Sequence, residues 1–127
     1  MNKMEDIANL AGGQIVVQLT ATDEQHRPSN QALRVKVDGE VVELASGGTV
    51  HLEAGQSICI PPRTIHQFWG AAGSGISVST EVSSVCDDLA DNVFLQPATR
   101  FPLIQEGQPR RYYLCTEYPR SDTLEAV

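Results

Sequence analysis

His66 is the residue of this chain best placed for chemistry, in the stretch GQSICIPPRTIHQFWG that runs from Gly55 to Gly70. Five residues separate Gly55 from Pro61, and four separate Pro61 from His66. The glycine ends one strand at a turn and the double proline bends the backbone, so His66 is expected where a strand enters a barrel. A histidine nitrogen combined with carboxylate oxygens suits manganese, iron, nickel or zinc. A lone histidine between apolar residues is, however, more often a satisfied structural residue than a ligand.

The spacing of this stretch resembles the second motif of the cupins, G-x5-P-x-G-x2-H-x3-N, with Arg63 at the second glycine and Gly70 at the asparagine. The closing half of the first cupin motif, G-x5-H-x-H-x3,4-E-x6-G, matches Glu5 and Gly12, which six residues separate. The resemblance implies that Glu5 and His66 are two of four metal ligands. It also implies that the H-x-H pair lies before the first residue, as in a cupin truncated at its amino terminus.

A narrower resemblance, covering nearly the whole chain, is to the sugar-isomerase cupins typified by D-lyxose ketol-isomerase. Five segments carry it in order, KMEDIANLAGGQIVVQL, IPPRTIHQFWG, EVSSVCDDLADNVF, RFP and LCTEYP. It implies an all-β cupin fold, a double-stranded β-helix or jelly-roll barrel without its first strands. It further implies a metal-dependent aldose–ketose isomerase, with manganese the usual ion and zinc, iron or nickel as alternatives. The substrate would be a small sugar, converted from D-lyxose to D-xylulose or from D-mannose to D-fructose.

Aldose–ketose isomerisation moves a proton between adjacent carbons, so a side chain must carry the proton while a metal polarises the oxygens. The resemblance implies that Lys3, in KMED, and Glu81, in EVS, are these catalytic groups. Taken alone, Lys3 and Glu5 near a chain start would be solvated charges. Glu5 and His66 are also fewer than the three protein ligands of most catalytic sites, so weak metal affinity is expected.

Turn signals recur about every ten residues, a spacing typical of an all-β sandwich or barrel. Strands are expected at 14–20, 32–37, 40–44, 49–53, 57–60, 64–69 and 76–82. Asp38-Gly39 predicts a two-residue hairpin in which Arg34 faces Glu43.

The turn at 71–75 predicts that strand 64–69 pairs with strand 76–82, so that His66 faces Ser79 and lies near Glu81 on one face. In an open sheet the serine-glutamate face would be solvated. In a closed barrel it would line a cavity with room for a hydroxylated ligand, and the motif match favours this second interpretation.

The sequence gives less support to other residues as metal ligands. His51 alternates with apolar neighbours and should face outward, and His26 lies in a polar loop. Asp87, Asp88 and Asp91 form an acidic cluster that is better explained as a solvated, turn-forming loop.

Length and composition predict one globular domain, a cupin barrel over 1–119 with a polar tail over 120–127. The net charge of -7, from 9 basic and 16 acidic residues, argues against nucleic acid or an anionic membrane as partner. No apolar run approaches the roughly 20 residues of a membrane helix, and no leader opens the chain. Cys59, Cys86 and Cys115 are odd in number and widely spaced, which predicts reduced thiols and a cytoplasmic location.

Three functions therefore remain open. In the first, the chain is an isomerase whose missing ligands come from upstream residues or from a partner chain. In the second, it is a degenerate cupin that binds sugar or has a regulatory role. In the third, it is a structural or interaction module. A barrel deprived of a strand exposes an edge, which predicts a homodimer or a swapped strand.

Overall fold

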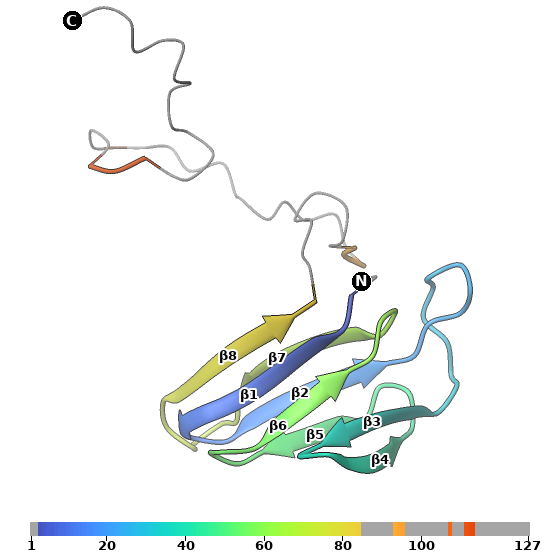
Figure 1. Cartoon of the computed structure of the whole chain (residues 1–127), viewed down its shortest axis with the longest axis horizontal. Helices are drawn as coiled ribbons and strands as arrows, with labels where there is room; N and C mark the ends of the chain where they lie inside the picture. The colour runs from blue at the N-terminus through green and yellow to red at the C-terminus, as the bar shows by residue number, and fades with distance from the viewer. Residues whose placement is uncertain (1–2, 85–92, 96–106, 108–110, 114–127) are drawn as a thin grey trace, which may run out of the picture. The chain divides into compact units, whose positions relative to one another are not determined.

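The computed structural model describes residues 3–84, 93–95, 107 and 111–113 (Figure 1). The strands are β1 (Glu5–Gly12), β2 (Ile15–Thr20), β3 (Leu33–Val37), β4 (Glu40–Leu44), β5 (Thr49–Leu52), β6 (Ser57–Ile60), β7 (Ile65–Gly70) and β8 (Ser77–Ser83). They all fall within one compact unit, Met1–Phe94. The predicted tail over 120–127 lies outside the described residues.

Two antiparallel sheets make up this unit. One has the strand order β4-β3-β6-β1-β8 and the other has the order β5-β2-β7. Figure 1 shows the two layers stacked face to face. The fold is thus the predicted all-β, cupin-like architecture, although within the described strands the sheets form an open sandwich instead of a closed barrel. No helix long and apolar enough to span a bilayer occurs among the described residues.

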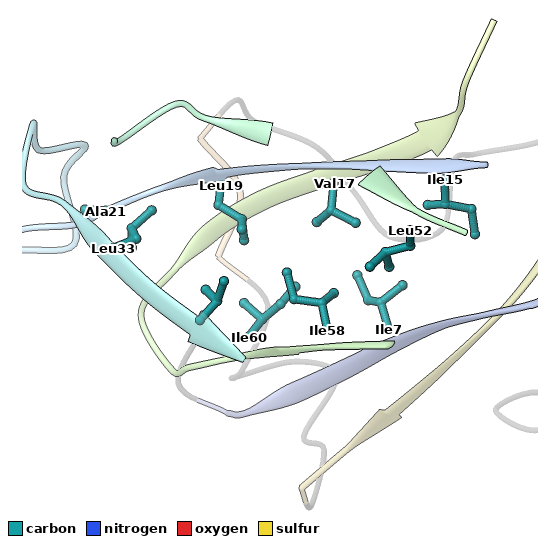
Figure 2. Close-up of a cluster of buried hydrophobic side chains, with 10 residues drawn as sticks. Ile7, Ile15, Val17, Leu19, Ala21, Leu33, Leu52, Ile58 and Ile60 are labelled. Atoms are coloured by element: carbon teal, nitrogen blue, oxygen red, sulfur yellow. The ribbon is translucent and has the colours of Figure 1, made fainter. Parts of the chain in front are cut away.

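The core lies between the sheets and follows the two-residue period of the strands. Ile7 and Ile58 of one sheet and Val17 and Leu19 of the other are fully buried. Figure 2 shows these side chains reaching toward one another from opposite layers. Asn9 is also fully buried, and its amide nitrogen donates to the carbonyls of Gly13 and Leu52, 2.9 Å away in each case. The polar group therefore ties β1 to the opposite sheet.

The hairpin between β3 and β4 is confirmed. Asp38 and Gly39 have φ values of 49° and 88°, as a two-residue hairpin turn with both central residues at positive φ requires. Arg34 faces Glu43, with the guanidinium Nε 3.3 Å from Oε1.

The predicted pairing of β7 with β8 is wrong. β7 pairs with β2, which places His66 opposite Leu19, and β8 pairs with β1, which places Glu81 opposite Ile7. The turn after β7 does form, with Gly73 and Gly75 at positive φ, but it carries the chain from one sheet to the other. Turn spacing alone cannot distinguish a hairpin from such a crossover.

Strand β1 was not predicted at all, although it lies between β6 and β8 in the larger sheet and pairs with both. Its inward positions include Glu5 and Asn9, so the usual alternation of apolar with polar residues is hidden.

Cys59 is a free, half-buried thiol, as predicted. Burial raises the pKa of the Cys59 thiol, and the Asp6 carboxylate, which accepts a hydrogen bond from it, raises this pKa further. Cys86 and Cys115 lie outside the described residues.

Candidate metal and sugar site

Glu5 begins β1 and points into the sandwich, where only 6% of its surface is exposed. Its neighbours in the sheet are Ile60 of β6 and Ser83 of β8. A carboxylate at such a position loses hydration and requires compensating partners.

His66 approaches this carboxylate from the opposite sheet. Its side chain is 10% exposed, and Nε2 lies 3.3 Å from Oε2 of Glu5. On the other side of the ring, Nδ1 lies 3.4 Å from the carbonyl oxygen of Thr64. Because a carbonyl only accepts hydrogen bonds, this contact favours a hydrogen on Nδ1 and directs Nε2 toward Glu5. The structure therefore brings together the two residues predicted to ligate a metal.

Lys3 supplies the partner that compensates the charge of Glu5. Its Nζ lies 3.2 Å from Oε1 of Glu5, and its side chain is only 9% exposed. The alternative interpretation, that Lys3 and Glu5 are only solvated charges, therefore does not hold. The Lys3 ammonium therefore balances the negative charge of Glu5 inside the protein.

Glu81 lies on the same side of the larger sheet as Glu5 but is exposed. Ser83 is directly opposite Glu5, and Glu81 is opposite Ile7, so Glu5 and Glu81 are diagonal neighbours. Their Cβ atoms are then roughly 7 Å apart. Glu81 thus borders the Lys3–Glu5–His66 cluster through β1, not through β7 as predicted.

Within the described part of the chain, no group of three or more histidine, cysteine, aspartate or glutamate residues could hold a metal. His51 lies on an exposed face, with Nδ1 2.6 Å from Oε1 of Gln14, and His26 is exposed in a loop. Neither joins the site, as predicted. Asp87, Asp88 and Asp91 lie outside the described residues.

The turn before His66 contains residues that the sequence interpretation did not identify as part of the site. Arg63 has a φ of 64°, a left-handed conformation that matches the glycine position of the cupin motif. Its guanidinium Nη2 donates to the carbonyl of Asp23 at 3.1 Å, and its own carbonyl accepts the hydroxyl of Thr22. These contacts hold the turn that presents Thr64 to His66. The sequence did offer one signal for this turn, because Arg63 stands where the cupin motif has a glycine.

A family model described as D-lyxose isomerase matches residues 1–118. A D-lyxose/D-mannose isomerase of Escherichia coli O157:H7 is 42% identical over 116 residues, which are 91% of this chain and 51% of the relative. A D-lyxose/D-mannose isomerase of Serratia proteamaculans is 43% identical over 118 residues, 93% of this chain and 52% of the relative. The chain thus spans about half the length of the curated relatives it matches. Because the family model and the two alignments each cover more than nine-tenths of the 127 residues of this chain, the chain belongs to the D-lyxose isomerase family.

Proposed function

We propose that this chain carries part of the active site of a metal-dependent aldose–ketose isomerase acting on D-lyxose, D-mannose or a similar sugar. The family and the names of the relatives support the reaction class. The observation that carries the proposal is the buried contact of 3.3 Å between Glu5 and His66, made from opposite sheets.

The donor set fits a divalent ion of the manganese, iron, nickel or zinc group, because it combines one carboxylate with one imidazole nitrogen. Glu5 and His66 would hold the ion, which when bound would polarise the oxygens at the two reacting carbons of the sugar. Two residues are fewer than the three protein ligands usual in catalytic sites. We therefore infer that further ligands, the H-x-H histidines, come from polypeptide outside these residues or from a partner chain.

Proton transfer is assigned to groups of this chain. Glu81 is an exposed carboxylate at the border of the site, so a sugar hydroxyl or carbon-bound proton can reach it without entering the core. Lys3 is buried beside Glu5 and holds a positive charge there, where it would orient the carboxylate and stabilise negative charge on a sugar oxygen.

A second candidate function is a metal-free sugar-binding or regulatory module. Its support is the Lys3 ammonium, which lies 3.2 Å from Oε1 of Glu5 and already balances the charge of that carboxylate. In this alternative Lys3 takes the place of the ion in neutralising Glu5, and isomerisation is absent.

An activity assay distinguishes the isomerase from the metal-free module. The tag-free chain is incubated with Mn²⁺ and D-lyxose, and the formation of D-xylulose is measured. We expect weak or no turnover by the chain alone, and a large gain in both metal content and rate after an H-x-H segment is fused before Met1. His66→Ala in the fused protein should abolish the gain, whereas His51→Ala, at an exposed histidine of β5, should not. A fused protein that binds sugar, but does not bind manganese and does not convert the sugar, would support the regulatory module instead.

A further inference from the structure

We propose that Phe68 is a specificity residue of the candidate site, where its ring contacts the end of the sugar that lies away from His66. This role rests on the proposed function, because it requires a sugar bound between β7 and β8. In this role Phe68 distinguishes six-carbon from five-carbon sugars.

Phe68 belongs to the inward face of the sandwich and is nevertheless exposed. In the register of β7 with β2, Phe68 lies opposite Val17, which is fully buried. His66, two positions earlier, lies opposite Leu19, which is also fully buried. Phe68 therefore shares the inward face of β7 with His66. It is 37% exposed, whereas an inward phenylalanine is normally covered. An aromatic ring in this position is available to a ligand.

The facing strands of the larger sheet explain why the ring is exposed. The inward side chains of β1 are all buried, namely Glu5, Ile7 and Asn9. Their partners on β8 are all exposed, namely Ser83, Glu81 and Ser79. β7 and β8 are the last strands in the order of their sheets (Figure 1). This difference indicates that, within the described residues, the three-stranded sheet covers β1 but leaves the inward face of β8 accessible.

The accessible faces of β7 and β8 offer a sugar both kinds of contact that it needs. The Glu81 carboxylate and the serine hydroxyls of β8 can exchange hydrogen bonds with sugar hydroxyls. The Phe68 ring can instead pack against the carbon-bound hydrogens, which form the apolar surface of a sugar. One aromatic side chain combined with a few polar groups is typical of sites for small molecules.

The spacing along β7 decides which end of the sugar Phe68 contacts. His66 and Phe68 are two residues apart on one face of a strand, so their Cα atoms are separated by roughly 7 Å. This separation is comparable to the length of the carbon chain of a sugar. In the proposed reaction the first two carbons lie beside Glu5 and His66, so the last carbons would lie beside Phe68. D-mannose has a sixth carbon that D-lyxose lacks, whereas carbons one to four are arranged alike in the two sugars.

Sugar binding by the full chain with added Mn²⁺ tests this role, through ligand-observed NMR titrations with D-mannose and with D-lyxose. Phe68→Leu should weaken D-mannose binding by roughly three- to tenfold, because leucine keeps an apolar side chain beside Val17 but removes the ring. The affinity for D-lyxose should stay within about twofold. Phe68→Tyr keeps the ring and should keep the affinity for D-mannose. Phe68→Met provides a second variant without the ring if the leucine variant does not fold.

Trp69→Leu is the matched control. Trp69 is 44% exposed on the same strand, but it lies opposite Val16 on the outward face, so its loss should change neither affinity. Equal losses for the two sugars in Phe68→Leu would overturn the proposal. So would an unchanged affinity for D-mannose, as expected if another part of the protein covers Phe68, or a chain that binds neither sugar.

Measurements of metal content and turnover keep this role separate from the proposed isomerase. A changed sugar preference in Phe68→Leu, without metal or turnover in the H-x-H fusion, would support the role of Phe68 and reject the isomerase. Metal binding and turnover by the fusion, with an unchanged sugar preference in Phe68→Leu, would support the isomerase and reject the role of Phe68.

Discussion

His66 and Glu5 meet across the sandwich, with 3.3 Å between Nε2 and Oε2, although one belongs to the three-stranded sheet and the other to the five-stranded sheet. Their separation therefore depends on how the two sheets pack. Any change that shifts the sheets relative to each other should alter this contact before it alters either strand.

Replacing Lys3 by methionine should lower the free energy of unfolding by about 3 kcal/mol, because Glu5 would remain buried with one partner fewer. Urea unfolding monitored by circular dichroism measures this change. Lys36→Met is the control, since Lys36 is exposed on β3 and its loss should change stability by less than about 0.5 kcal/mol. Equal effects of the two substitutions would contradict a buried role for Lys3.

Arg63 allows backbone strain to be separated from side-chain contact. Arg63→Ala keeps the left-handed backbone at φ 64° and removes the guanidinium bond to Asp23, whereas Arg63→Gly removes both the bond and the strain. The glycine variant should therefore be more stable than the alanine variant by about 1 kcal/mol. Thermal and urea unfolding of the two variants measure this difference. Equal stability of the alanine and glycine variants would show that the backbone at position 63 is not strained.

Gly12 is expected to tolerate no side chain. It has a φ of 87°, and an added Cβ would stand 2.1 Å from the carbonyl oxygen of Ile76, so the chain leading into β8 would have to move. Gly47 has a nearly identical φ of 85° but open space around it. Gly47→Ala should cost about 1–2 kcal/mol for conformation alone, and Gly12→Ala should cost clearly more. Chemical denaturation of both variants gives the difference, and similar losses would place Ile76 farther away than the structure does.

Cys59 should react slowly with iodoacetamide at neutral pH, because its raised pKa keeps the thiol protonated to higher pH than in an ordinary cysteine. The rate should rise only as the pH passes this raised pKa. Asp6→Asn removes a negative charge and should shift the midpoint downward without restoring it fully, since burial remains the larger cause. Peptide mapping by mass spectrometry isolates Cys59 from the other cysteines, and an unchanged midpoint would exclude the Asp6 contact.

Much of the local structure could be predicted from the sequence. The Asp38-Gly39 hairpin and the pairing of Arg34 with Glu43 follow from a turn chemistry that few other residues accept. The choice of His66 as a candidate ligand followed from its spacing after Gly55 and Pro61. These features depend on neighbours in the chain, so local residue types suffice.

The partners of β7 and β8 could not be predicted in this way. A tight turn joins them, yet each pairs with a strand distant in sequence, because two sheets that cover each other bury the core of Ile7, Val17 and Leu19. Strand β1 was missed for a related reason. Its inward Glu5 and Asn9 look like surface residues until the other sheet provides their partners.

The sequence by itself thus determined the all-β class, the turns and two ligand candidates, since periodicity, glycine and proline act over short distances. Only the tertiary structure decided that Lys3 is buried, that Glu5 touches His66, and that Glu81 borders them from β8. These relationships join residues far apart in the chain. They depend on which faces of two sheets meet, and that choice is made by burial of the whole core and not by any local pattern.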